Sequence, residues 1–261
     1  MSTLIVIPAR LGSTRLPQKP LRDLAGKPLI VRVLERVRAV YPGADAVVAT
    51  DSEAIASAVA AAGGTCVLTS AAHPSGTDRV AEVAALPAYR EYDVLVNVQG
   101  DEPFITAEAI QVAAGFAERG EFPIGTAACH DDAAILQEPS VVKVATDRTG
   151  RALYFSRAPI PFLRDSSDRA IRDSLVLRHV GIYAYTRAAL TRWVSLPIHP
   201  LERAEQLEQL RPLADGMPIG VGVLSSRPHA GIDTEADLRS AVRTWASESL
   251  STPPPVAAGT R

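Results

Sequence analysis

Short apolar runs alternate with segments of helical period through the first half of the chain. Leu29, Val33 and Val37 keep one face of such a segment apolar, as an amphipathic helix requires. The apolar runs predict strands at Thr3–Ile7, Ala46–Thr50, Thr65–Leu68, Val94–Val98 and Ile124–Ala128, and the periodic segments predict helices at about 28–41, 52–62, 77–86 and 106–119. Strand–helix alternation of this kind favours right-handed βαβ crossovers and a mostly parallel α/β sheet.

The alternation of strands and helices ends after about residue 140. Strands are predicted there with little helix between them, around a polar stretch at Arg164–Ser174: Val141–Thr146, Ala152–Phe155 and Val180–Tyr185. We interpret residues 140–190 as an inserted β-rich layer, of the kind that covers a pocket or forms a dimer contact. A helix at about 200–214, a strand at Ile219–Leu224 and a helix at Thr234–Trp245 follow. We therefore expect one domain over 1–246 and a disordered, proline-containing tail over 247–261.

Composition narrows the class of protein. A chain of 261 residues with 47% hydrophobic content can bury a large core, and a formal net charge of −2 argues against a nucleic-acid-binding protein. The two cysteines, Cys66 and Cys129, each lie in an apolar run, which predicts free buried thiols in a reducing compartment. No run approaches the ~18 apolar residues of a membrane span, and no signal peptide is recognisable, so we expect a soluble, cytoplasmic protein without a membrane partner.

Candidate chemistry begins directly after the first strand. Arg10, Arg15 and Lys19 follow the apolar run in a loop that also contains glycine and proline. Ligands of open α/β sheets bind beyond the carboxyl ends of the strands, so the three cations are placed where a polyphosphate can be held. The loop has neither G-x-x-x-x-G-K-[ST] nor G-x-G-x-x-G, which argues against kinases and dinucleotide-dependent dehydrogenases.

Two carboxylates are candidate metal ligands. Asp101 follows the strand near Val94 together with Gln99, and Asp233 precedes the last helix. Mg²⁺ binds through one or two carboxylates and takes its other ligands from water and phosphate oxygens. Each residue also has a purely structural interpretation, because Asp101 can cap a turn and Asp233 can cap the helix.

A third candidate segment is His73-Pro74-Ser75-Gly76-Thr77-Asp78-Arg79, which follows the strand near Thr65 and begins a helix. Its small hydroxyl residues and glycine allow a nucleotide to approach the backbone closely. The alternative is an ordinary helix start, with Thr77 as the cap and Arg79 in solvent.

These motifs occur in a specific order with others along nearly the whole chain, from about 3 to 246. I-P-A-R, S-T-R-L-P-x-K-P-L, H-P-S-G-T-D-R, V-N-V-Q-G-D-E-P, Y-F-S-R-A-x-I-P, R-H-x-G-I-Y and L-E-Q-L-R are all present. The set resembles the 3-deoxy-manno-octulosonate cytidylyltransferases, or CMP-Kdo synthetases. The resemblance implies a three-layer nucleotide-diphospho-sugar transferase fold and a homodimer formed through the inserted β-rich layer. It also implies transfer of CMP from CTP to 3-deoxy-D-manno-octulosonate (Kdo), with release of pyrophosphate, for lipopolysaccharide biosynthesis.

The resemblance also implies residue roles. Catalytic roles fall on Arg10, Arg15, Lys19, Asp101 and Asp233, with the two aspartates as Mg²⁺ ligands and the cations on the triphosphate. Nucleotide contacts match Pro8, Ala9, Arg10, Lys19, Ser75, Gly76 and Arg79, and sugar contacts match Gln99, Arg157, His179, Tyr183, Glu208 and Gln209. A bland alternative for His179 is a strand histidine bonded to a neighbour. Two positions depart from the family pattern, Ala72 for aspartate and Arg203 for histidine.

Three competing functions remain open from the sequence. Cytidylyltransferases for sialic acid, pseudaminic acid or 8-amino-Kdo share the CTP half of the site and differ in the sugar half. A nucleotide-binding protein without turnover has the same fold, but it does not need both Asp101 and Asp233. A dinucleotide-dependent oxidoreductase is disfavoured because the glycine fingerprint is missing. No side chain in the motifs is an obvious general base, so deprotonation of the attacking hydroxyl is assigned to the metal.

Overall fold

The computed structural model describes residues 1–12 and 15–251, with side chains as far as residue 247. Within them, nine strands form one sheet: β1 (Thr3–Ala9), β4 (Asp45–Thr50), β5 (Thr65–Leu68), β6 (Val94–Asn97), β7 (Ile124–His130), β8 (Lys143–Thr146), β9 (Ala152–Ser156), β10 (Leu177–Thr186) and β11 (Ile219–Leu224). The main path runs β11-β7-β10-β6-β1-β4-β5, and β8 and β9 extend it from β10. A two-stranded ribbon, β2 (Asp23–Leu24) and β3 (Lys27–Pro28), lies apart.

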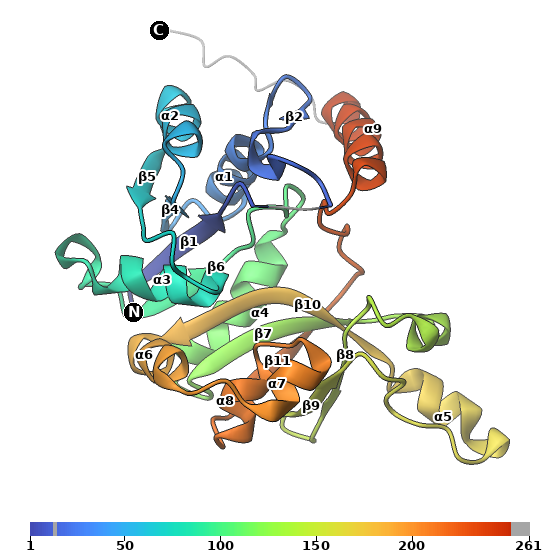
Figure 1. Cartoon of the computed structure of the whole chain (residues 1–261). Coiled ribbons are helices and arrows are strands. Elements are labelled where there is room, and N and C mark those ends of the chain that lie inside the picture. The colour runs from blue at the N-terminus through green and yellow to red at the C-terminus, as the bar shows by residue number, and fades with distance from the viewer. Residues whose placement is uncertain (13–14, 252–261) are drawn as a thin grey trace, which may run out of the picture.

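Helices cover both faces of the sheet (Figure 1). The first face carries α1 (Leu29–Val40), α2 (Glu53–Ala61), α4 (Ala107–Glu118) and α9 (Glu235–Ser251). The second carries α3 (Gly76–Ala85), α6 (Arg187–Ser195) and α8 (Leu210–Ala214), with α7 (Pro200–Glu205) packed on α8. Short 3-10 turns are η1 (Lys19–Leu21), η2 (Pro87–Tyr89), η3 (Ala133–Gln137) and η4 (Ser166–Asp168), and the last of these precedes α5 (Arg169–Ser174).

Two cores follow from the alternation of side chains along each strand. In β1, Ile5 and Ile7 face the first core, whereas Leu4 and Val6 face the second. Burial on both faces explains why the predicted strands are continuous apolar runs. On the main path every strand except β10 runs in the same direction, which confirms the three-layer α/β fold with a mostly parallel sheet.

The predicted inserted layer is wrong in one respect, because β10 is not part of a separate layer. It pairs antiparallel with β6 on one side and β7 on the other, at the centre of the main sheet. Its side chains explain this position: Ile182 and Ala184 lie in the first core, and Tyr183 and Tyr185 in the second. The rest of the segment is a β8–β9 hairpin followed by α5, which projects from the body (Figure 1).

Local predictions also needed correction. The polar stretch 164–174 contains η4 and α5, and α6 lies in a segment for which no helix was predicted. The single helix expected at 200–214 is two helices, because Gln206 adopts φ 52° and ends α7. Both cysteines are free, as predicted, and Cys129 is buried, but Cys66 is only partly buried. No helix among the described residues is long and apolar enough to cross a membrane.

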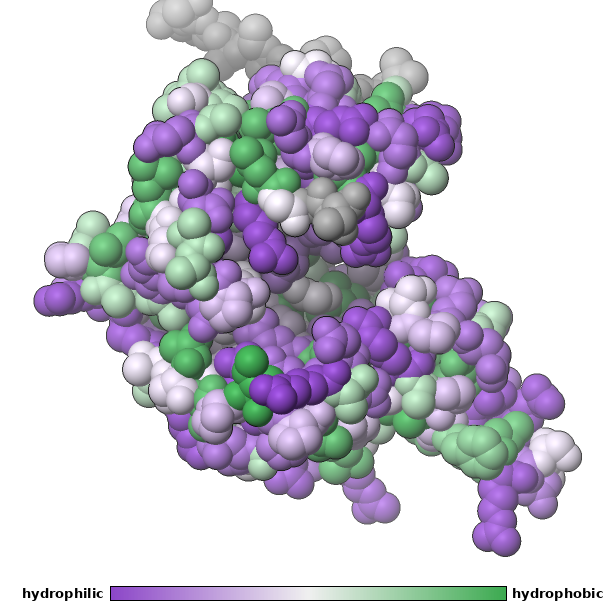
Figure 2. Space-filling view, in the orientation of Figure 1, coloured by the Kyte–Doolittle hydropathy of each residue, from purple (hydrophilic) through white to green (hydrophobic). Residues whose placement is uncertain are grey.

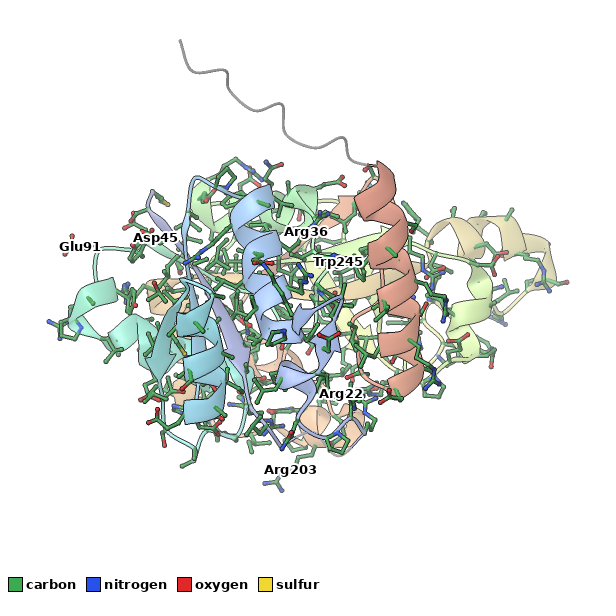
Figure 3. The ribbon with its side chains drawn as sticks, turned by 90° about the horizontal axis from the view of Figure 1, so that it is seen from above. Arg22, Arg36, Asp45, Glu91, Arg203 and Trp245 are labelled. Atoms are coloured by element: carbon green, nitrogen blue, oxygen red, sulfur yellow. The ribbon has the colours of Figure 1, made fainter. Side chains whose placement is uncertain are left out.

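The C-terminal helix is longer than expected. α9 continues to Ser251, so residues 247–251 of the predicted disordered tail are helical, and residues 252–261 lie outside the described part. The sequence between Trp245 and Ser251 contains neither glycine nor proline, and the prolines that end a helix come only from Pro253. α9 lies beside α1 (Figure 3), where the guanidinium of Arg32 stacks 4.7 Å from the ring centroid of Trp245.

Candidate active site

A cavity of about 350 Å³ opens at the carboxyl ends of the parallel strands. Figure 2 shows a hollow between the two halves of the molecule, bordered by hydrophilic side chains. The lining residues come from the loops after β1, β5 and β6 and from the approach to α9: Pro8, Ala9, Arg10, Gly12, Arg15, Lys19, Pro20, His73, Ser75, Gly76, Arg79, Gln99, Gly100, Asp101 and Asp233. The topology therefore brings together the three candidate segments that were identified separately in the sequence.

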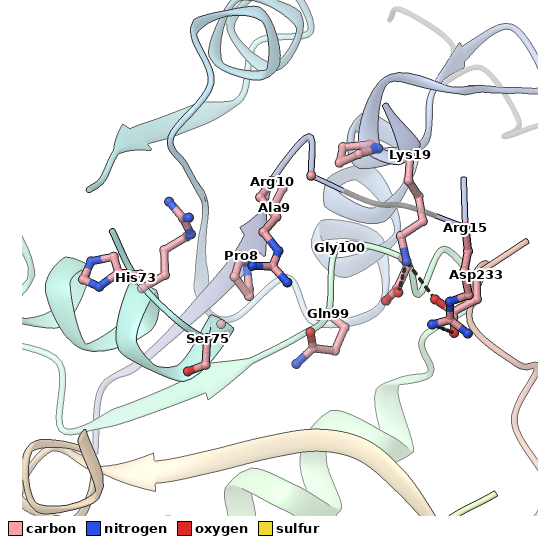
Figure 4. A pocket seen from close by; sticks show the side chains of 15 residues that line it. Pro8, Ala9, Arg10, Arg15, Lys19, His73, Ser75, Gln99, Gly100 and Asp233 are labelled. Atoms are coloured by element: carbon pink, nitrogen blue, oxygen red, sulfur yellow. Dashed lines mark hydrogen bonds and ion pairs between the residues drawn. The ribbon is translucent and has the colours of Figure 1, made fainter. Parts of the chain in front are cut away.

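Leu16 and Pro20 anchor the backbone on either side of Lys19, whose side chain points into the cavity (Figure 4). Leu16 is buried in the first core, and its carbonyl accepts a hydrogen bond from the Lys19 N–H at 3.1 Å. Pro20, also buried, forms the first turn of η1. The backbone that carries the ammonium is thus anchored on both sides.

The two candidate metal ligands converge on one point. Nζ of Lys19 lies 2.5 Å from Oδ2 of Asp101 and 3.0 Å from Oδ1 of Asp233 (Figure 4). The Ile232 N–H donates to the Asp101 carbonyl at 2.9 Å, so the backbones of the two segments are joined directly. Burial lowers the pKa of Lys19, but attraction to the two carboxylates outweighs it and the pKa is raised, which keeps the ammonium charged.

The side chain of Asp101 does not cap the turn, and that of Asp233 does not cap the helix, which were the alternative structural roles. Thr234 caps α9, since its Oγ1 accepts from the Asp237 N–H at 3.2 Å, and Asp237 accepts in return from the N–H of Thr234 at 2.8 Å. The carboxylate of Asp233 is left to bind Lys19, and Arg15 at 3.1 Å. In the turn at Asp101, the Glu102 N–H donates to the Gln99 carbonyl, and the Asp101 carboxylate again faces Lys19.

These carboxylates fit a divalent cation. Their oxygens already converge on one positive charge, and they come from rigid ends of β6 and α9. No group of three or more acidic, histidine or cysteine side chains suited to a metal occurs in the described residues, so a cation held by these two carboxylates would take its other ligands from water and the substrate. That composition is typical of Mg²⁺ sites that also bind phosphate.

Glu102 is a neighbour that the sequence reasoning missed. Burial, together with the charges of Asp101 and Asp233, raises the pKa of its carboxyl to about 8 although Lys19 opposes the shift. A Cβ added at Gly231 would lie 2.7 Å from Oε1 of Glu102, so a larger residue there would displace the Glu102 carboxyl. The signal was its place in the Gln99–Glu102 turn, directly after a candidate ligand.

Close backbone packing shapes the opposite end of the cavity. A Cβ at Gly100 would lie 2.8 Å from the carbonyl oxygen of Pro8, and one at Gly76 would lie 3.3 Å from Cγ of Pro8. Ser75 caps α3 by accepting from the Asp78 N–H at 3.2 Å, so the cap is not Thr77. The glycines therefore let the loops after β1, β5 and β6 meet around the cavity.

The charged residues near that end differ in their partners. Arg79 is buried and not solvated: its Nη2 lies 3.2 Å from Oδ2 of Asp51, and Nη1 bonds Thr69. His73, a lining residue that was not among the site candidates, bonds Glu82 through Nε2. Arg10 is exposed and forms no ion pair among the described residues, so its guanidinium is available to an anionic ligand.

The candidate sugar residues are only partly assembled. Gln99 lines the cavity, and Glu208 reaches it through Ser75, whose Oγ lies 3.0 Å from Oε1 of Glu208. Tyr183 packs against His179 with ring centroids 5.5 Å apart. Gln209 is buried, in the turn between α7 and α8. These residues lie on the side of the sheet that carries the second core.

Arg157 is engaged elsewhere. Its Nε donates to the Glu205 carbonyl at 2.8 Å and its Nη1 donates to the Pro139 carbonyl at 2.9 Å, so the guanidinium joins α7 to the segment before β8. The carboxylate of Glu205 accepts from the Arg157 N–H at 2.9 Å. The side chain is thus held at the end of β9 and is not among the residues that line the cavity.

Burial changes the ionisation of the sugar-side candidates. It lowers the pKa of His179 to about 3, so the ring is neutral, and Nε2 lies 3.0 Å from Oγ1 of Thr126. It raises the pKa of Glu208 and of Tyr183. The bond to Thr126 matches the bland interpretation of His179 and also fixes the orientation of its ring.

Comparison with known proteins places the chain in a family. The cytidylyltransferase family model matches residues 4–219. A 3-deoxy-manno-octulosonate cytidylyltransferase of Gemmatimonas aurantiaca is 56% identical over 245 residues, which cover 94% of this chain and 95% of the relative. This chain belongs to the 3-deoxy-manno-octulosonate cytidylyltransferase family. It is accordingly a nucleotidyltransferase, and the resemblance drawn from the sequence motifs is confirmed.

Other members of the family agree. The 3-deoxy-manno-octulosonate cytidylyltransferase of Leptothrix cholodnii is 50% identical over 244 residues, covering 91% of this chain and 89% of the relative. A solved structure of CMP:2-keto-3-deoxy-manno-octonic acid synthetase complexed with CTP is 40% identical and superposes with a TM-score of 0.87, covering 95% of this chain and 100% of that one. The two departures from the family pattern lie outside the cavity lining: Ala72 is exposed, and Arg203 projects from α7 (Figure 3).

Proposed function

We propose that this enzyme transfers CMP from CTP to the anomeric hydroxyl of Kdo and releases pyrophosphate, supplying CMP-Kdo for lipopolysaccharide biosynthesis. The observation that carries the proposal is the arrangement in one cavity of Lys19 between Asp101 and Asp233, with Arg10 and Arg15 on the same loop. Phosphoryl transfer of this type depends on positioning and on charge stabilisation more than on covalent catalysis.

The nucleoside half of CTP is assigned to the glycine-lined end of the cavity. Pro8, Ala9, Ser75 and Gly76 present backbone and small side chains there. Arg79 is held by Asp51, and this ion pair fixes the orientation of the guanidinium at this end of the cavity. Gly76 and Gly100 carry no Cβ, which lets their loops pack closely against Pro8 and form the wall of this end of the cavity.

The triphosphate is assigned to Arg10, Arg15 and Lys19. Among the described residues, Arg10 has no competing ion pair, and Arg15 is largely exposed and has a single ion pair, with Asp233. The three cations offset the charge that develops on the departing pyrophosphate, and removal of one such preorganised partner typically costs ~3 kcal/mol of transition-state stabilisation.

Asp101 and Asp233 would hold Mg²⁺, for the reasons of fit given above. A divalent cation held by these two residues would supply positive charge to the triphosphate and would lower the pKa of the attacking hydroxyl. The chain contributes the alignment: the bond from Ile232 to the Asp101 carbonyl and the cap at Thr234 fix the two carboxylates relative to each other.

The sugar acid is assigned to Gln99, Arg157, His179, Tyr183, Glu208 and Gln209. Glu208 contacts the nucleotide loop through Ser75, so a ligand at these residues lies next to the nucleotide. For Arg157 to grip the Kdo carboxylate with two parallel bonds, its guanidinium must release a main-chain carbonyl or use its remaining N–H groups.

A homodimer is part of the proposal. Large apolar side chains are exposed on the segment that carries α5, with Phe162 81%, Ile171 63% and Leu175 55% exposed. Exposed apolar side chains gathered on a projecting segment are typical of a protein interface. We also place the enzyme in the cytoplasm, because both cysteines are free.

A single assay tests the function. Pyrophosphate release is followed with CTP, Mg²⁺ and either Kdo, 8-amino-Kdo, sialic acid or pseudaminic acid. The proposal expects kcat/KM to be highest for Kdo, and preference for another sugar acid would assign the enzyme to that substrate. Calorimetric binding of CTP without pyrophosphate release from any of them would indicate a nucleotide-binding protein without turnover.

A further inference from the structure

Lys19 occupies the position between the two carboxylates that a divalent cation would take. Its Nζ lies 2.5 Å from Asp101 and 3.0 Å from Asp233, from two different segments of the chain. In Figure 4 the side chain reaches across from its loop to the carboxylates, and both contacts are drawn. The lysine assigned to the triphosphate is thus, in this conformation, the counter-ion of the metal ligands.

The ion pair between Lys19 and Asp101 is largely shielded from water. The Lys19 side chain is only 16% exposed and that of Asp101 24% exposed, so water screens this pair weakly, whereas the Asp233 side chain is 44% exposed. Arg15 differs, since 67% of its side chain is exposed and its ion pair among the described residues is with the other oxygen of Asp233. Lys19 is therefore the cation whose position competes directly with a metal.

We propose that Lys19 keeps the divalent cation out of the site until a nucleoside triphosphate draws its ammonium away from Asp101 and Asp233. The inference rests on the proposed function, because it assigns the triphosphate to the same cavity. An ammonium group and a divalent cation cannot share one pair of carboxylates, since like charges within ~3 Å repel strongly. Metal then enters with the nucleotide or after it, and not before.

The chemistry of the two groups makes the exchange feasible. Lysine is a flexible point charge on a four-carbon stem, so Nζ can move to a phosphate oxygen without moving the anchored backbone of η1. A triphosphate carries more negative charge than the two carboxylates and recruits the ammonium. Metal and nucleotide binding are then positively coupled, and each raises the affinity for the other by the same factor.

The decisive experiment measures metal binding without turnover. Mn²⁺ is titrated into nucleotide-free protein and followed by electron paramagnetic resonance, for the wild type and for Lys19→Met, which keeps an unbranched side chain one atom shorter and removes the charge. We expect Lys19→Met to bind Mn²⁺ at least ~10-fold more tightly, by analogy with other charge couplings of 1–3 kcal/mol. Lys27→Met is the matched control, because Lys27 forms an ion pair of 2.5 Å with Glu35 and does not line the cavity.

Two further measurements make the result specific. The gain in Mn²⁺ affinity must disappear in the double variant Lys19→Met/Asp101→Asn. Mg²⁺ alone must also raise the melting temperature of Lys19→Met more than it raises that of the wild type. If Lys19→Met does not fold, Lys19→Gln takes its place. In addition, the complex of the wild type with α,β-methylene-CTP must bind Mn²⁺ at least ~10-fold more tightly than the free analogue does.

Equal Mn²⁺ affinity of the wild type and the Lys19 variants, without nucleotide, would overturn the inference. The same outcome would leave the proposed function intact if the wild type releases pyrophosphate from CTP and Kdo. If Lys19→Met binds Mn²⁺ more tightly but the wild type releases no pyrophosphate, the inference about Lys19 is supported and the proposed reaction is contradicted.

Discussion

Oγ of Ser75 lies 3.0 Å from Oε1 of Glu208, and this contact joins the nucleotide loop to the turn between α7 and α8. The two residues are assigned to different substrates, so the contact is a direct route by which one half of the site affects the other. We expect the effects of Ser75→Ala and Glu208→Gln on kcat/KM to be non-additive by ~1 kcal/mol, as for other hydrogen-bonded pairs. Steady-state kinetics of the single and double variants measure the difference.

The control for this cycle is Thr106→Ala. Thr106 caps α4 as Ser75 caps α3, but its Oγ1 accepts only from the Ala109 N–H within its own helix start. Its effect should add to that of Glu208→Gln within error. Strict additivity of Ser75→Ala with Glu208→Gln would show that the contact does not couple the two subsites.

Asp101 and Asp233 converge on one cation position, so neither can replace the other. We expect Asp101→Asn and Asp233→Asn each to abolish pyrophosphate release even at saturating Mg²⁺, because an amide contributes no charge to a metal. Asp215→Asn is the matched control. Asp215 forms an ion pair of 2.5 Å with Arg192 and does not line the cavity. A near-normal kcat in both variants would remove the metal assignment.

The sequence was sufficient to predict the parallel part of the fold. Runs such as Leu4–Ile7 are buried on both faces, and that burial makes them recognisable without partners. The same logic placed Lys19, Asp101 and Asp233 at one edge, because the carboxyl ends of parallel strands meet there. Periodicity does not specify which strands are neighbours, and β10 was therefore assigned to an insertion although it lies between β6 and β7.

Side-chain partners were the part that the sequence did not reveal. Thr234 and Asp233 are adjacent and both suit a helix cap, and only the bond from Asp237 to Thr234 shows which one caps α9. The guanidinium of Arg157 bonds main-chain carbonyls of Pro139 and Glu205, which no motif encodes. Such contacts depend on the tertiary approach of distant segments.

Arg157 is expected to have two separable roles. Arg157→Ala should raise KM for Kdo about 10- to 100-fold, the loss of one charge-assisted grip, and leave KM for CTP nearly unchanged. It should also lower the melting temperature, because the Pro139 and Glu205 carbonyls lose their donors. Arg151→Ala, at an exposed pair with Asp147, is the control. A defect confined to CTP would contradict the assignment of Arg157 to the sugar.

The exposed apolar side chains near α5 predict the site of dimerisation. We expect Ile171→Asp to convert the dimer to a monomer in sedimentation velocity, because a buried unpaired carboxylate opposes association. Ile198→Asp is the matched control: Ile198 is 49% exposed and lies outside the segment. A wild-type monomer would contradict the proposed homodimer, and a dimer that survives Ile171→Asp and dissociates with Ile198→Asp would place the interface elsewhere.

The neutral ring of His179 predicts a specific dependence of stability on pH. Its pKa is lowered by burial from 6.5 to about 3, so between these values the unfolded chain binds a proton that the folded chain does not. The stabilisation is therefore complete above about pH 6.5 and is lost as the pH falls toward 3. His179→Gln removes this titration and retains a partner for Thr126. Urea unfolding should show the wild type losing up to ~1.4 kcal/mol per pH unit relative to the variant across that window. His130→Gln, at an exposed histidine, is the control. If the difference in unfolding free energy between the wild type and His179→Gln stays constant from pH 7 to about pH 4.5, the ring is protonated in the folded enzyme.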